Sequence, residues 1–117
     1  MKIAIAHEHP PTRQVLSRAL TVRLRAEVTD FSCVEDVLAS KLDYDIFVVY
    51  NNFGHKLSGV QGVKEIRKRV PRAFIIGVSG TPNYDRKFLP AGADKFILRS
   101  GNEIQELVGM IQHQLAT

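Results

Sequence analysis

The sequence contains a single cysteine, Cys33, among 117 residues, which excludes an internal disulfide framework. This scarcity is typical of a reducing compartment, and we interpret Cys33 as a small buried apolar residue rather than a reactive thiol. No apolar run reaches the roughly 20 residues of a transmembrane helix. The amino terminus also lacks the small-residue cleavage site of a signal peptide. We therefore expect a cytoplasmic protein that makes no membrane contact.

Low-complexity stretches, internal repeats and an obvious linker are also absent, so we expect one compact domain over residues 1–117. The 16 Lys and Arg residues exceed the 12 Asp and Glu residues, giving a formal charge of +4. This balance allows contact with nucleic acid without requiring it. The densest basic cluster, residues 64–72, falls mostly on an expected helix, and we favour a solvated helix face there.

Apolar residues follow two alternating rhythms along the chain. Short apolar runs predict strands at residues 2–6, 26–31, 45–50, 73–79 and 95–98. Helical spacing predicts four helices, whose apolar positions are Val15, Leu16, Ala19 and Leu20; Val34, Val37 and Leu38; Val60, Val63, Ile66 and Val70; and Ile104, Leu107, Val108, Ile111 and Leu115. The Ser-x-x-Glu patterns at 32–35 and 100–103 predict capping boxes. Residues 80–94 hold too much Gly and Pro for a long helix, and we expect a reduced turn there.

The alternation of apolar strands and helices predicts the fold class. We expect an α/β protein with a doubly wound, five-stranded parallel sheet and helices on both faces. Functional sites in such sheets form beyond the carboxyl ends of the strands. The residues at these ends are His7, Glu8, His9, Tyr50, Asn51, Asn52, Ser79, Gly80 and Arg99.

The segment AGADKFILRS, residues 91–100, is the most specific motif in the chain. Together with HEHP after the first strand, it resembles a response-regulator receiver domain, and the resemblance covers nearly the whole sequence. The aromatic position of that family's motif matches Phe96, its lysine matches Arg99, and its Ser or Thr matches Ser79. The resemblance implies a flavodoxin-like fold and a role in two-component signal transduction or a phosphorelay.

The phosphorylation pocket of the family is the part that matches least well. The resemblance places the phosphorylated aspartate at Tyr50 and the two acidic metal ligands at His7 and Glu8. Magnesium needs hard oxygen ligands, typically more than one carboxylate, and a phenol with a pKa of about 10 is a weak nucleophile. We therefore expect a degenerate, or pseudo-, receiver that is no enzyme and holds no metal or cofactor.

Several residues of this pocket have two interpretations. Arg99 either pairs with Glu8, which would mimic a charged closed state, or is solvated. For Ser79 a hydrogen bond with the local backbone is favoured over the hydrogen bond that the matching residue of the family makes when the domain is switched by phosphate. For His7 a passive strand-end position is favoured over pH sensing. The four histidines, His7, His9, His55 and His113, have no acid or Cys cluster that would support a metal site.

We expect the domain to act through protein contacts, by binding a protein partner or by dimerisation. The resemblance implies an interface on the fourth helix, fifth strand and fifth helix, with Phe96, Ile97, Arg99, Asn102, Gln105 and Glu106. DNA contact is expected only through an additional helix-turn-helix domain beyond Thr117, as in a transcription regulator.

Three alternatives remain open. The first is a receiver phosphorylated at an unusual residue, with Glu8 holding the metal. The second is a basic nucleic-acid-binding module that uses Lys64, Arg67, Lys68, Arg69 and Arg72. The third, a small flavodoxin-like enzyme, is disfavoured because no nucleotide-type glycine loop follows the first strand.

Overall fold

The computed structural model describes residues 1–51 and 56–116, and structural statements below refer to these residues. The strands are β1 (Lys2–Ala6), β2 (Glu27–Phe31), β3 (Ile46–Tyr50), β4 (Phe74–Ser79) and β5 (Lys95–Leu98). The helices are α1 (Pro10–Leu24), α2 (Val34–Ala39), α3 (Gly59–Arg69), α4 (Asp85–Ala91) and α5 (Glu103–Ala116). None of the helices in these residues is long and apolar enough to cross a membrane.

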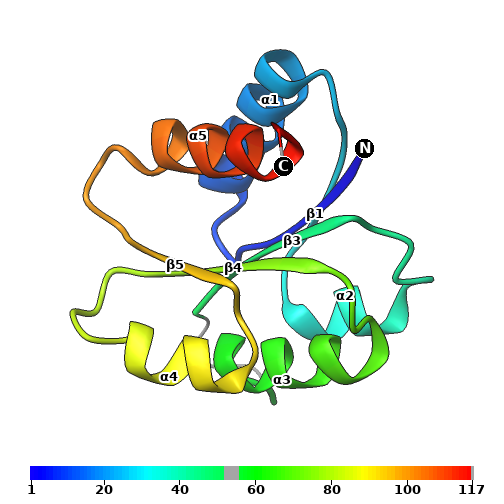
Figure 1. Cartoon of the computed structure of the whole chain (residues 1–117), viewed down its shortest axis with the longest axis vertical. Coiled ribbons are helices and arrows are strands. Elements are labelled where there is room, and N and C mark those ends of the chain that lie inside the picture. The colour runs from blue at the N-terminus through cyan, green and yellow to red at the C-terminus, as the bar shows by residue number, and fades with distance from the viewer. Residues whose placement is uncertain (52–55, 117) are drawn as a thin grey trace.

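The five strands form one parallel sheet in the order β2-β1-β3-β4-β5. Helices α1 and α5 cover one face, and α2, α3 and α4 cover the other (Figure 1). All five residues of β3 are buried, as its continuous apolar run predicts for a central strand. The predicted fold class is confirmed.

Strand alternation divides the core into two layers. Ile3, Ile46 and Val48 pack in the cluster under α1 and α5. Ala4 and Phe47, one position along on the same strands, pack in the cluster under α2, α3 and α4. Successive side chains of a strand point to opposite faces of its sheet. The same rule decides which face the residues at each strand end approach.

The AGAD part of the most specific motif has a structural role. Asp94 Oδ2 accepts hydrogen bonds from the Ile75 backbone N–H at 2.8 Å and from Arg67 at 2.7 Å. Arg67 also donates to the carbonyl oxygen of Gly92. Gly92 ends α4 with φ at 124°, a left-handed conformation that favours glycine. These contacts fix the start of β5 against α3 and β4.

Several local predictions are wrong. At 32–35 no capping box forms: Cys33 caps α2 without a side-chain hydrogen bond, and Ser32 bonds Asp36 instead. The capping box predicted at 100–103 is also wrong, because α5 begins at Glu103 and the Glu103 carboxylate accepts hydrogen bonds from Tyr50 and Arg99. Residues 85–91 form a short helix rather than a turn, with Pro90 inside it. Leu115 and Val15 belong to the predicted apolar stripes but are exposed by more than half.

Gly77 in β4 is needed for the packing of α4. A Cβ atom there would lie 2.4 Å from the ring of Phe88, which is fully buried. We predict that Gly77→Ala lowers the free energy of unfolding by about 1–3 kcal/mol, because the added methyl group overpacks the core against Phe88. Gly109→Ala is the control: nothing lies within 4 Å of its Cβ, and alanine in a helix interior should add about 0.5–1 kcal/mol. Urea unfolding measures both, and equal effects would contradict this packing.

Candidate functional site

Three of the predicted pocket residues meet at the carboxyl edge of the sheet, on the side of α1 and α5. Tyr50 ends β3 on the same face as Val48, and His7 follows β1 on the same face as Ile5. The His7 and Tyr50 rings are tilted, with centroids 4.2 Å apart. The Arg99 guanidinium lies 6.0 Å from the centroid of the Tyr50 ring. Tyr50 thus lies between His7, which follows β1, and Arg99, which follows β5.

A fourth residue, Glu103, completes this cluster from the first turn of α5. The Tyr50 hydroxyl donates a hydrogen bond to Glu103 Oε2 at 2.5 Å, and Arg99 Nε donates to Glu103 Oε1 at 3.1 Å. The Glu103 side chain is only 13% exposed. Both oxygens of one sheltered carboxylate therefore hold a phenol and a guanidinium together, and such charge-assisted hydrogen bonds are among the stronger ones.

The surroundings of Tyr50 make its hydroxyl an even weaker nucleophile than an ordinary phenol. The side chain is buried, which raises the pKa of Tyr50 well above its ordinary value of 10.0, and the hydrogen bond to the Glu103 carboxylate raises it further. The Tyr50 hydroxyl donates a hydrogen bond to the Glu103 carboxylate and keeps its proton. Tyr50 consequently stays neutral and acts as a donor.

His7 is also neutral at physiological pH. Burial, together with the positive charge of Arg99, lowers the pKa of His7 from 6.5 to about 4. Its Nδ1 accepts a hydrogen bond from the backbone N–H of His9 at 3.0 Å. The proton therefore sits on Nε2, which is buried and has no hydrogen-bond partner among the described residues. A neutral, buried ring fits the passive strand-end role better than pH sensing near neutrality.

The remaining two pocket residues lie apart from this cluster. Ser79 follows Val78 on β4, so its side chain approaches the opposite face of the sheet. Its Oγ accepts a hydrogen bond from the Thr81 backbone N–H at 3.0 Å, the local role favoured above. Glu8 is exposed. Arg99 pairs with Glu103, so neither of its two interpretations, a pair with Glu8 or a solvated side chain, describes it.

The donor set does not fit the magnesium ion that the fold family uses. Glu8 is the one carboxylate at the matching positions, the Tyr50 oxygen points into Glu103, and His7 Nδ1 already accepts the His9 N–H. No group of three or more potential ligands lies together among the described residues. His55 and most of the segment 51–54 lie outside the described residues.

The predicted interface residues are divided between surface and core. Asn102, Gln105 and Glu106 are exposed at the start of α5, and Phe96 is half-buried. Ile97 is wrong as an interface residue, because it is 1% exposed and packs in the core under α1 and α5.

The predicted basic cluster is largely engaged within the molecule. Arg67 donates to three backbone carbonyls, Arg69 donates to the carbonyl oxygen of Leu38, and Lys68 pairs with Glu65. These contacts weaken the nucleic-acid alternative.

No family model matches the sequence, and no curated protein matches it. Solved structures do. The beryllium-fluoride-activated receiver domain of DrrB superposes with a TM-score of 0.86 at 20% identity, covering 99% of this chain and 97% of that chain. DrrB is a response regulator of Thermotoga maritima. The fold is that of a response-regulator receiver domain.

Two further structures with the receiver fold are similar at higher identity. The T. maritima response regulator TrrA, in complex with Mg²⁺ and a beryllium fluoride, has a TM-score of 0.80 at 24% identity, over 94% of this chain and 97% of that one. A DNA-binding response regulator of the LuxR family from Staphylococcus aureus has 0.81 at 23%, over 96% of both chains. The predicted receiver fold is thereby confirmed.

Sequence reasoning missed Glu103 as a member of this receiver-fold site. The Ser-x-x-Glu pattern assigned its carboxylate to a helix cap, which is the usual meaning of that spacing. The signal that points to its real role is the four-residue separation between Arg99 and Glu103, together with an acid at the start of α5 facing the strand ends. An unusual tyrosine at the end of β3 needs such a polar partner for its hydroxyl.

The buried neutral His7 predicts a pH-dependent stability. Between pH 6.5 and about 4 the unfolded chain binds a proton at this histidine that the folded chain does not bind, so acidification favours unfolding. The free energy of unfolding should fall by up to about 3 kcal/mol over this range through His7 alone. His7→Asn should keep an acceptor for the His9 N–H and reduce the dependence of the free energy of unfolding on pH. The exposed control His113→Asn should keep the wild-type dependence. Identical slopes for the three proteins in urea unfolding would contradict a buried neutral His7.

Proposed function

We propose that this chain is a phosphorylation-independent receiver domain that acts in signal transduction through protein contacts. The observation that carries the proposal is the Glu103 carboxylate held between the Tyr50 hydroxyl and Arg99. Arg99 stands at the position of the family's phosphate-contacting lysine, and here its partner anion is supplied by the protein itself. Glu103 takes the place that a phosphoryl group would have beside this cation.

An internal anion has a functional consequence. A receiver that gains its anion by phosphorylation changes between two states, whereas a permanent carboxylate favours one arrangement at all times. The hydrogen bond to Tyr50 and the pair with Arg99 connect β3, the end of β5 and the first turn of α5. We infer that the surface formed by α4, β5 and α5 is held in a single, constitutive conformation.

This surface carries exposed apolar side chains. Leu89 and Leu98 are 44% and 43% exposed, and with Phe96 they line a hollow of about 550 Å³ between α4 and β5. Asp85 and Lys95 line the same hollow with opposite charges. A two-fold axis that passes through this hollow can pair Asp85 of each copy with Lys95 of the other. We therefore take a second copy of this chain as the first partner to test.

Loss of the phosphorylation switch is tested with a phosphoryl mimic. Beryllium fluoride and Mg²⁺ are added to the isotope-labelled protein, with Mg²⁺ alone and fluoride alone as controls. We expect no specific shift of the amide NMR signals of Tyr50, Ser79 and Arg99, because Tyr50 fills the pocket and one carboxylate does not hold the ion. Saturable shifts at these amides that require all three components would establish a working switch and refute the proposal.

Self-association is tested by sedimentation equilibrium without any phosphodonor. The wild-type protein should form a concentration-dependent dimer. Leu98→Glu should dissociate it, because the change buries two like charges across the two-fold axis. Val22→Glu is the matched control, since Val22 is 71% exposed on α1 and lies away from β5. A dimer equally sensitive to both changes, or a wild-type protein that stays monomeric, would argue against this interface.

A further inference from the structure

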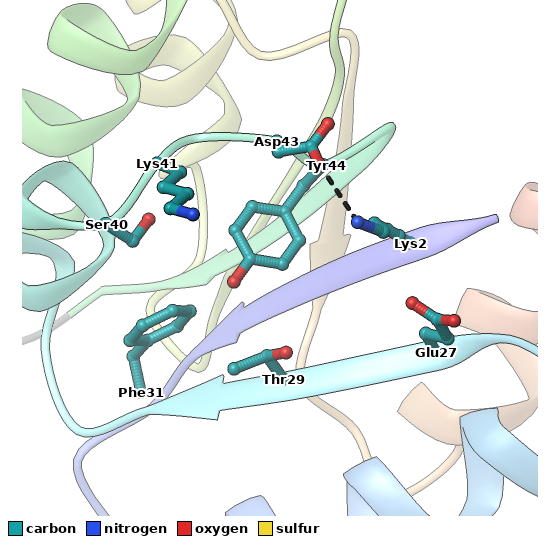
Figure 2. Close-up of a pocket in the computed structure, with 8 residues that line it drawn as sticks. All are labelled: Lys2, Glu27, Thr29, Phe31, Ser40, Lys41, Asp43 and Tyr44. Carbon is teal, nitrogen blue, oxygen red and sulfur yellow. Dashed lines mark hydrogen bonds and ion pairs between the residues drawn. The ribbon is translucent and has the colours of Figure 1, made fainter.

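A second concave site lies on the other face of the sheet from the Tyr50 cluster. It is a cleft of about 440 Å³ over β1 and β2, on the side of α2, and Figure 2 shows its lining. Phe31 and Tyr44, two of its lining residues, pack on the core beneath α2, α3 and α4. The cleft shares no residue with the Tyr50 cluster. What it binds therefore does not depend on whether the domain can be phosphorylated.

The cleft exists because α2 is short. This helix ends at Ala39, after six residues, and leaves Lys2 of β1 and Glu27 and Thr29 of β2 exposed. The chain returns to β3 through a loop in which Leu42 adopts a left-handed conformation with φ at 55°. That loop places Tyr44 over the uncovered part of the sheet (Figure 2).

Two aromatic rings form a rigid wall of the cleft. The Tyr44 ring meets Phe31 edge-on, with centroids 6.1 Å apart, and meets the fully buried Phe47 edge-on at 5.7 Å. Such edge-to-face contacts hold an aromatic side chain in one orientation. The Tyr44 hydroxyl points toward Phe31 and Thr29 (Figure 2). A planar apolar ligand would find a preformed surface here.

The charges of the cleft give it a polarity. Lys2 and Asp43 neutralise each other in an ion pair of 2.9 Å. Lys41 has no hydrogen bond or ion pair to any residue in the described ranges, and its ammonium group lies on the side of the Tyr44 ring away from Glu27 (Figure 2). An anion is therefore attracted to the Lys41 end and repelled from the Glu27 end.

We propose that this cleft binds a small aromatic carboxylate. The ring would pack against Tyr44 and Phe31, and the carboxylate would pair with Lys41. The volume lies in the range of small-molecule sites, roughly 300–1,000 Å³. An open cleft of this kind implies weak binding, with a dissociation constant on the order of 1 mM. Occupancy would bridge β2 and the loop before β3.

The test is an amide NMR titration of the full chain with 2-naphthoate. We expect saturable shifts at Thr29, Phe31 and Tyr44, and no comparable binding of the uncharged 2-naphthalenemethanol. Lys41→Met keeps the aliphatic stem and should weaken binding about three- to five-fold, the effect of one exposed charge. Lys64→Met, an exposed lysine change on α3, should leave it unchanged.

Three results would each overturn the proposal. The first is the absence of saturable shifts up to about 10 mM, a concentration that fills most of a site with millimolar affinity. The second is equal binding of the alcohol and the carboxylate, and the third is binding that Lys41→Met does not weaken. Lys41 is exposed, so this variant should fold, and its result decides the question even if Tyr44→Leu, the complementary change of the wall, is unstable.

Discussion

The hydrogen bond between the Tyr50 hydroxyl and Glu103 is the contact on which the carboxyl edge of this domain depends. It joins the central strand to the first turn of the last helix, at 2.5 Å and in a sheltered place. A buried hydroxyl without a partner would cost about 1–3 kcal/mol, so Tyr50 at this position requires an acceptor. Glu103, in turn, requires a cation, which Arg99 supplies four residues earlier. Tyr50, Glu103 and Arg99 thus satisfy one another's polar groups in a sheltered position.

Strand alternation determines which residues can enter this network. Side chains at the ends of β1 and β3 that face α1 and α5 meet one another, so His7 lies 4.2 Å from Tyr50 between ring centroids. Ser79, one position out of phase, bonds its own loop. The period of two residues therefore converts a single row of strand-end positions into two separate environments. In one environment Glu103 binds the Tyr50 hydroxyl. In the other, Ser79 accepts a local backbone hydrogen bond.

The sequence predicted the fold well and the site only in part, and particular residues explain the difference. Continuous apolar runs such as β3 can be buried in one way, so strand positions and the parallel sheet were predictable. Ile97 was assigned to an interface because the resemblance implies one on the fifth strand, yet strand alternation turns its side chain inward. Glu103 was assigned to a cap because a local pattern cannot reveal a partner 53 residues away, as Tyr50 is. Long-range pairs depend on the packing of α5 across the sheet, which no local spacing encodes.

A double-mutant cycle on Tyr50 and Glu103 tests the central claim most directly. The free energy of unfolding is measured for the wild type, Tyr50→Phe, Glu103→Gln and the double variant. If the two side chains stabilise one arrangement of β3 and α5, the single changes are not additive, and the coupling is about 1.5–3 kcal/mol, as for hydrogen bonds to charged groups. Additive effects within about 0.5 kcal/mol would contradict the claim that this contact holds the carboxyl edge together.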